Sequence, residues 1–211
     1  MRKLLKYGFL LAFAAVVLWG GWSLLHPTEE NDVFLVILDP GHGGDDPGAM
    51  VGETMEKDIN LAIALLVREQ LADQEDVTVV MTREQDVFLS LTDRAELANQ
   101  EKADLYVSIH ANALEGDDSF AGIFTFYHPD KRSDQAVAET IQAAVSASSG
   151  GLDRGVRSED YAVLRETDMS AVLVETGFMT CPEELSMLQD LDYQKLLAVG
   201  IAQGILNCRT D

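Results

Sequence analysis

Residues 33–44 read Val-Phe-Leu-Val-Ile-Leu-Asp-Pro-Gly-His-Gly-Gly. The apolar part of this stretch is too short to span a membrane and is rich in β-branched and aromatic residues, so it predicts a buried strand. A turn follows at once, because Pro40 and three glycines come next and glycine permits backbone conformations that other residues avoid. His42 stands in this turn, and two interpretations are open: an imidazole placed to meet a ligand or an ion, or a solvated side chain in a tight turn.

Outward from this stretch, strand and helix patterns alternate along the chain. Such alternation is typical of a mostly parallel sheet with helices on both faces. The sequence therefore predicts an α/β fold with a doubly wound, mostly parallel six-stranded sheet. The further strands are expected at 78–81, 104–110, 121–127, 161–164 and 171–176, with a loop through Arg157 and Glu159, and the helices at 57–72, from Ser90, at 133–148, from Pro182 and from Asp192.

Three ligand-capable side chains fall at the ends of predicted strands. His42 follows the first strand, His110 ends the strand at 104–110, and Glu175 stands near the end of the strand at 171–176. In open α/β sheets, functional groups collect just past the carboxyl ends of the strands. We therefore expect these three side chains to share one rim of the sheet.

The first 25 residues have the composition of a membrane anchor. The run from Gly8 to Leu25 carries no charge and is just long enough for a membrane helix. Three cations precede the run, which keeps that end in the cytoplasm and the rest of the chain outside. A cleaved signal peptide, which would leave a secreted protein, is the alternative, but the far end of the run has no clear small-x-small cleavage site.

These observations predict three segments. Residues 1–25 form the anchor, residues 26–32 form a short polar linker, and residues 33–211 form one domain. A length of 211 residues suits one domain with a short appendage. We expect a monomer held at the membrane, with its domain facing outward.

The charge balance excludes one class of partner. The chain carries a formal net charge of −21, and because its first 25 residues hold three cations and no acid, the remainder carries −24. That field repels nucleic acid and other polyanions, and no basic patch or nucleic-acid motif is present. The acidity itself indicates a solubilising surface.

The two cysteines, Cys181 and Cys208, belong to no metal-binding or redox motif. In an oxidising compartment they could pair as a disulfide. Two buried thiols are the other interpretation.

The histidines invite a comparison with hydrolytic zinc sites. Such sites commonly use two histidines and one carboxylate and leave a fourth position for water. His42 and His110 are the candidate nitrogen ligands, and the carboxylate is either Glu53 or Glu56, which lie in the connection between the first strand and the first helix. Glu56 stands next to the helix start, on firmer backbone, and is favoured. The other two histidines, His26 beside the anchor and His128 after a strand, are expected to have no such role.

Glu175 follows a very apolar strand, where a carboxylate is costly to bury unless it is paired or used. One interpretation is a salt bridge to Arg94 or Arg165. With a metal nearby, a general base is the better interpretation.

Taken together, these motifs resemble the zinc-dependent N-acetylmuramoyl-L-alanine amidases of the bacterial cell wall, of the type with a doubly wound catalytic domain. The resemblance covers residues 33 to 207, and the order and spacing of its motifs make it specific. It rests on Leu-Asp-Pro-Gly-His-Gly-Gly at 38–44, Glu56-Lys57, Met81-Thr82-Arg83, Arg94 with Ala98-Asn99, Ser-Ile-His-Ala-Asn-Ala at 108–113 and Leu-Val-Glu-Thr-Gly-Phe at 173–178.

The resemblance implies that zinc is held by His42, Glu56 and His110 and that Glu175 is the catalytic carboxylate. It further implies hydrolysis of the peptidoglycan amide between the lactyl group of N-acetylmuramic acid and L-alanine. Two departures, Ser170 in place of a common Pro and Thr180-Cys181 in place of a common Ser-Asn, affect substrate contacts beyond Glu175 and leave the metal site intact.

Two rival functions remain at this stage. One is another zinc-dependent wall amide hydrolase, a peptidase or a deacetylase. The other is a non-catalytic wall-binding module tethered at the membrane, although such modules commonly lose the metal-binding residues. A membrane-tethered amidase with no separate wall-binding domain also resembles the sporulation-specific kind. Cell separation and wall turnover are the other roles open to such an enzyme.

Some relatives carry an inhibitory insertion between the second histidine and the catalytic glutamate. Here two strands, a helix and a loop account for the segment between His110 and Glu175. We therefore expect an uncovered site, controlled by location or expression.

Overall fold

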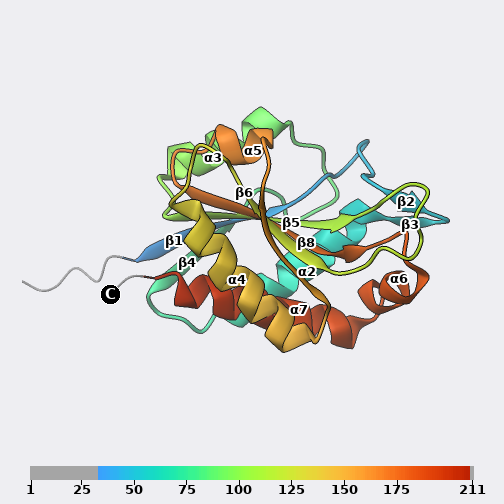
Figure 1. Cartoon of the computed structure of the whole chain (residues 1–211). Coiled ribbons are helices and arrows are strands. Elements are labelled where there is room, and N and C mark those ends of the chain that lie inside the picture. Colours follow the sequence, from blue (N-terminus) through green and yellow to red (C-terminus); the bar gives the residue numbers. More distant parts are fainter. Residues whose placement is uncertain (1–32, 210–211) are drawn as a thin grey trace, which may run out of the picture. The chain divides into compact units, whose positions relative to one another are not determined.

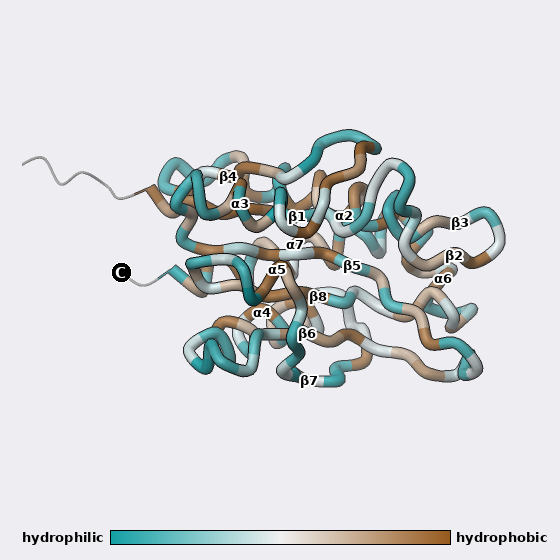
Figure 2. The backbone as a smooth tube through the Cα atoms, turned by 90° about the horizontal axis from the view of Figure 1, so that it is seen from above, coloured by the Kyte–Doolittle hydropathy of each residue, from teal (hydrophilic) through white to brown (hydrophobic). Residues whose placement is uncertain are grey.

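The computed structural model describes residues 33–209, and its centre is a six-stranded sheet (Figure 1). The strands follow one another across the sheet in the order β4-β1-β5-β8-β6-β7, which can be followed from one edge to the other in Figure 2. Their bounds are β1 Phe34–Pro40, β4 Val77–Met81, β5 Leu105–Asn112, β6 Ile123–Tyr127, β7 Asp153–Ser158 and β8 Ser170–Phe178.

The pairing of these strands confirms the mostly parallel sheet. Strand β1 is parallel to both β4 and β5, and β5 is parallel to β8. Strand β6 runs antiparallel to β8 and parallel to the edge strand β7. The carboxyl ends of β1, β5 and β8 therefore meet at one edge of the sheet, as expected from the sequence.

Helices cover both faces of the sheet. Figure 1 shows α3 and α5 above it and α2, α4 and α7 below it. The helices are α2 Glu56–Leu71, α3 Leu91–Glu101, α4 Asp134–Ser149, α5 Ala162–Arg165, α6 Pro182–Leu188 and α7 Leu191–Asn207. The helix expected from Ser90 begins as its sequence indicates, since the Ser90 side chain accepts a hydrogen bond from the Asp93 backbone N–H.

Each central strand contributes to two apolar cores. Val36 and Leu38 of β1 belong to the core on the face covered by α2, α4 and α7, whereas Ile37 between them belongs to the core on the face covered by α3 and α5. On β5, Tyr106 also belongs to the α3 and α5 face. Because side chains alternate along a strand, His110 points to that same face, and this is the face on which the site forms.

One predicted strand is wrong, and one segment that the sequence predicts to be a loop is a strand. Residues 162–164 instead belong to the short helix α5, whose N-cap is Tyr161 and whose buried residues are Val163 and Leu164. The sixth strand is instead β7, which reads Asp-Arg-Gly-Val-Arg-Ser and has no buried residue. A polar edge strand lacks the apolar pattern on which strand prediction depends. The short hairpin of β2 Met50–Val51 and β3 Thr54–Met55 was also not predicted.

The expected anchor at 1–25 and linker at 26–32 lie outside the described residues. Within residues 33–209, no helix has both the length and the apolar character that crossing a membrane requires.

A buried ion pair ties β1 to α3. Asp39 and Arg94 are almost fully enclosed, and Oδ1 of Asp39 lies 2.6 Å from Nη1 of Arg94. Three hydroxyl groups also donate to this carboxylate, from Thr82, Tyr106 and Ser108. Burial alone would raise the pKa of Asp39, but the charge of Arg94 and these hydrogen bonds hold it below its ordinary value.

Replacing Arg94 by Met should lower the free energy of unfolding by about 3–5 kcal/mol, because the Asp39 carboxylate would remain buried without its counter-charge. Urea denaturation of the two proteins measures the difference. Arg68→Gln is the matched control: Arg68 pairs with Glu84 at the surface, so its loss should cost about 0–1 kcal/mol. Equal losses in the two variants would contradict the importance of the buried pair.

Candidate active site

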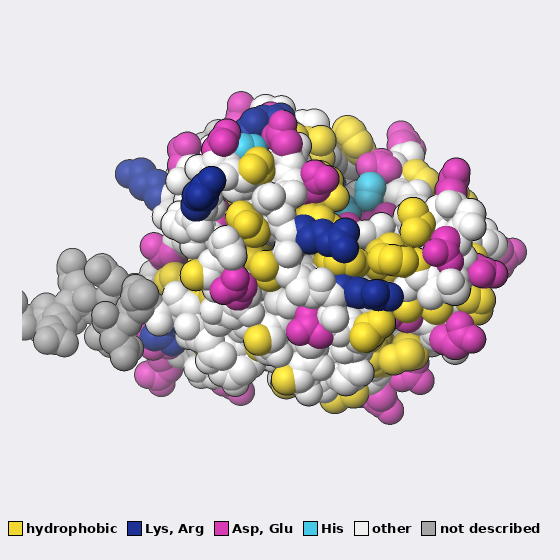
Figure 3. All heavy atoms as spheres, in the orientation of Figure 1, with side chains coloured by type: hydrophobic (Ala, Val, Ile, Leu, Met, Phe, Trp, Pro, Cys, Tyr) yellow, Lys and Arg dark blue, Asp and Glu magenta, His cyan; other side chains and the backbone are white. Residues whose placement is uncertain are grey.

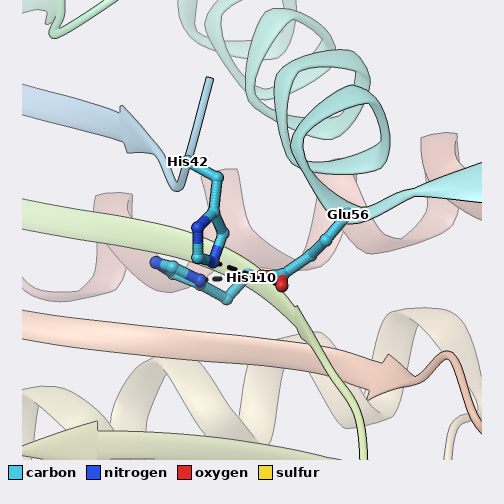
Figure 4. Close-up of side chains that lie close together, drawn as sticks. All are labelled: His42, Glu56 and His110. Atoms are coloured by element: carbon cyan, nitrogen blue, oxygen red, sulfur yellow. Dashed lines mark hydrogen bonds and ion pairs between the residues drawn. The ribbon is translucent and has the colours of Figure 1, made fainter. Parts of the chain in front are cut away.

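Three side chains from separate elements converge at the carboxyl edge of the sheet (Figure 4). His42 lies in the turn after β1, Glu56 is the first residue of α2, and His110 lies on β5. Nε2 of His42 is 3.2 Å from Oε2 of Glu56, and Nδ1 of His110 is 2.9 Å from Oε1 of the same carboxylate. One potential ligand atom from each residue lies within 4.8 Å of the other two.

The backbone around His42 allows the three side chains to come this close together. His42 has a φ of 61°, in the left-handed region that a non-glycine residue seldom adopts. A Cβ on Gly41 would lie 2.2 Å from the His110 ring, and a Cβ on Gly48 would lie 2.5 Å from Oε2 of Glu56. Glycine is required at both positions, because any side chain would displace one of the converging groups.

The Glu56 carboxylate is held from several sides. Its Oε2 accepts a hydrogen bond from the Ala49 backbone N–H, and its Oε1 accepts one from the Asn60 side chain, one helical turn further along α2. Burial would raise the pKa of Glu56, but the hydrogen bonds with His110 and His42 outweigh burial and hold the pKa far below its ordinary value. Glu56 is therefore an anionic group with both oxygens fixed in direction.

His42 has a second carboxylate on its other ring nitrogen. Its Nδ1 donates to Oδ2 of Asp46 at 2.8 Å. Burial lowers the pKa of His42, but the bonds to Glu56 and Asp46 outweigh it and raise the pKa to about 9. A carboxylate on the far nitrogen of a metal-ligating histidine fixes the orientation of the ring, so Nε2 of His42 is directed at Glu56.

The donor set fits a zinc ion. Two imidazoles and one carboxylate form the ligand set of many hydrolytic zinc sites. Ligand atoms about 2.1 Å from a tetrahedral zinc are about 3.4 Å from each other, close to the 3.2 Å and 2.9 Å that separate the histidine nitrogens from the Glu56 oxygens. Small side-chain movements would suffice to accommodate the ion.

Glu175 stands opposite His110 on the neighbouring strand β8. It is 8% exposed, and its Oε2 is buried without a hydrogen-bond partner among the described residues. Burial raises the pKa of Glu175 to about 7. The salt bridge considered from the sequence does not form, because Arg94 pairs with Asp39 and Arg165 pairs with Asp160.

His42, His110 and Glu175 open into one cavity of about 330 Å³. The opposite wall is mostly apolar and comes from two segments, the stretch that leads into the first turn of α3 and the start of α5. It includes Phe88, Leu89, Leu91, Tyr161, Ala162 and Val163. A polar reactive edge beside an apolar wall is typical of a small-molecule or polymer-end site.

The remaining sequence candidates lie apart from this cluster. Glu53 is exposed, which leaves Glu56 as the carboxylate near the histidines. His128 is buried and bonds to Asp160 through Nε2, as expected for a histidine without a ligand role. His26 lies outside the described residues. Cys181 and Cys208 are both free.

Sequence reasoning missed two members of the site, Asp46 and Asn60. A signal existed for Asn60, because it stands four residues after Glu56 on the same helix face. No signal singled out Asp46 from its exposed neighbour Asp45, because only the turn geometry brings one of them to His42.

Comparison with known proteins gives a consistent result. A family model described as N-acetylmuramoyl-L-alanine amidase matches residues 36–207. The germination-specific N-acetylmuramoyl-L-alanine amidase of Bacillus subtilis (strain 168) is 32% identical over 238 residues, covering 100% of this chain and 98% of that protein.

Solved structures of amidases share the fold. The N-acetylmuramoyl-L-alanine amidase from Clostridium difficile 630 superimposes with a TM-score of 0.81 at 40% identity, covering 83% of this chain and 96% of that one. The CwlD amidase from Clostridioides difficile, solved in complex with the GerS lipoprotein, gives a TM-score of 0.78 at 34% identity, covering 82% and 97%.

Asp46→Asn should lower the affinity for zinc by about 10–100-fold, because the amide no longer fixes the His42 ring as the carboxylate does. Competition with a chromogenic chelator measures the affinity. Asp45→Asn removes the same charge from the adjacent exposed residue and should leave the affinity unchanged. Equal affinities for the Asp46 variant and the parent would contradict the orienting role.

Proposed function

This chain belongs to the family of N-acetylmuramoyl-L-alanine amidases, and from that premise we propose that His42, Glu56 and His110 hold a catalytic zinc ion and that Glu175 is the catalytic carboxylate. The chain is a peptidoglycan amidase. The observation that carries the assignment of roles is the pairing of a convergent His-Glu-His donor set with the buried, unpartnered carboxylate of Glu175, which lines the same cavity as His42 and His110.

The bond that we assign to this site is the amide between the lactyl group of N-acetylmuramic acid and L-alanine of the stem peptide. When bound, zinc supplies Lewis-acid chemistry, lowering the pKa of a water molecule to roughly 7 and stabilising negative charge that develops on a carbonyl oxygen. The ligand residues keep their directions through Asp46, Ala49 and Asn60.

Glu175 carries the proton. Its unpartnered Oε2 accepts a proton from the water that attacks the amide carbonyl, and the same oxygen then returns the proton to the amine of L-alanine as it leaves. The apolar wall of the cavity excludes bulk water from this exchange and strengthens the electrostatic interactions inside it.

The catalytic domain acts outside the cytoplasm in this proposal, where its substrate is. The apolar run in residues 1–25 supports retention at the membrane, with residues 26–32 as a linker and 33–211 as the zinc amidase domain. The similarity to the germination-specific amidase of Bacillus subtilis supports a role with spore peptidoglycan.

Control of the site needs no inhibitory insertion. Between His110 and Glu175 the chain forms β6, α4, β7 and α5, which are elements of the sheet and of its helical layers. We keep control by location or expression, as expected from the sequence, and add control by a protein partner. The complex of the similar CwlD amidase with the GerS lipoprotein supports such a partner.

Glu175→Gln should retain zinc and lose turnover by about 10²–10⁴-fold, because the amide cannot accept the proton. Zinc content is measured by elemental analysis, and turnover by mass analysis of stem peptides released from sacculi. Glu53→Gln, in an exposed position, is the control and should match the parent. Release at the parent rate by the Glu175 variant would contradict the assignment of the base.

His42→Ala should lose both zinc and activity, because it removes one of three protein ligands. Chelator treatment of the parent should abolish activity, and added zinc should restore it. His128→Ala is the control, because His128 bonds to Asp160, away from the cluster. A metal-free parent that still released L-alanine-terminated peptides would refute the zinc proposal.

A further inference from the structure

Two arginines of the edge strand β7 lie on the face of the sheet that carries the active site. In the pairing of β6 with its two neighbours, Phe124 stands opposite Glu175 of β8, and Phe126 stands opposite Arg157 of β7. The register of β7 shifts next to Gly155, which has a φ of 75°. Such a bulge changes the direction of nearby side chains. Arg157 contacts an aromatic ring of β6, and Arg154 contacts an aromatic ring in the segment before β6.

These contacts hold the guanidinium groups in place. Cζ of Arg157 lies 4.4 Å from the centre of the Phe124 ring, and Cζ of Arg154 lies 4.7 Å from the centre of the Phe120 ring. The two rings are nearly parallel, at 5°, with centres 6.3 Å apart. A stacked guanidinium keeps its N–H groups in its own plane, free to donate sideways.

Neither arginine forms an ion pair with any described residue. This is notable in a chain with 36 acidic and 15 basic residues. Arg154 donates from Nε to the Ala121 carbonyl oxygen, whereas the side chain of Arg157 forms no hydrogen bond with the described residues. Figure 3 shows basic side chains among hydrophobic ones on the side of the molecule that faces the viewer.

We propose that Arg157, assisted by Arg154, binds a carboxylate of the stem peptide and so makes the enzyme prefer acidic peptides. The inference rests on the proposed function, since it places the scissile amide at Glu175. A planar guanidinium binds a carboxylate through two parallel hydrogen bonds, and the apolar rings beneath it reduce competition from water. Arg157 is exposed and its donors are therefore accessible to substrate.

The distance between Arg157 and Glu175 matches the length of a short peptide. Strand β7 is two strands away from β8, which corresponds to about 10 Å at the usual strand spacing. An extended chain advances about 3.4 Å per residue, so the residue that follows L-alanine, with its side chain, reaches this distance. The glycan side of the scissile bond offers no carboxylate while the lactyl group is amidated, so the anion must come from the peptide.

The test compares two synthetic substrates, N-acetylmuramoyl-L-alanyl-D-glutamate with free carboxylates and the same compound with both carboxylates amidated. The parent should show a KM about ten-fold lower for the acidic compound, the effect of one charge-assisted hydrogen-bonded pair. Arg157→Gln should raise the KM for the acidic compound about ten-fold, with kcat unchanged, and should leave the KM for the amidated compound as it was.

Two further variants make the result specific. Arg157→Lys should recover part of the preference, because it keeps the charge and loses the planar fork. Arg132→Gln removes another exposed arginine that forms no ion pair with the described residues, next to α4, and should match the parent on both compounds.

The outcomes separate this inference from the proposed function. A parent that cleaves both compounds with equal KM, or an Arg157 variant whose KM rises equally for both, overturns the carboxylate site and leaves the amidase assignment standing. A parent that cleaves neither overturns the proposed function itself. The preference of the parent is informative even if a variant fails to fold.

Discussion

Two buried guanidinium groups hold the turn after β1, and the position of the first histidine depends on them. Arg94 donates to the carbonyl oxygens of Pro40 and His42, at 2.8 Å and 2.7 Å. Arg83 donates to those of Pro40 and Gly41, each at 3.0 Å. A buried carbonyl without a partner costs free energy, so a turn that leaves the sheet ladder needs donors from elsewhere. The left-handed backbone conformation of His42 is stable because hydrogen bonds from Arg83 and Arg94 hold the carbonyl groups of the turn in place.

The same arrangement couples the site to the core. The charge of Arg94 is balanced by Asp39 within β1, so one ion pair fixes the end of the strand, the start of the turn and a helix on the upper face. The metal-ligand candidates thus depend on a polar network beneath them, in addition to the apolar cores above and below the sheet. A site with rigid supports keeps its donor atoms close to the geometry that a metal needs.

The sequence predicted the parts of this protein that depend on pattern and missed those that depend on local geometry. His42, His110 and Glu175 could be found because parallel strands bring their carboxyl ends together, and Glu56 because it begins a helix; their roles stay proposals. Asp46 could not be separated from Asp45, because only the turn decides which of them reaches His42. Strand β7 was missed because an exposed edge strand needs no apolar residues, while the apolar residues at 161–164 belong to a helix that packs on the sheet.

The two buried glutamates of the site have different surroundings, which shift their pKa values in opposite directions and suit them to different roles. Glu56 has hydrogen bonds from two imidazoles, two backbone N–H groups and a side-chain amide, so its pKa is held down and it remains an anion suited to a metal. Glu175, on the other side of His110, has a buried oxygen without a partner, and its pKa rises to about 7. A carboxylate that gains and loses a proton near neutral pH suits a general base, and one that never does suits a ligand. The opposite shifts therefore support the proposed roles independently of any resemblance, because exchanging the roles would require the partnered carboxylate to take up the proton and the unpartnered one to stay charged.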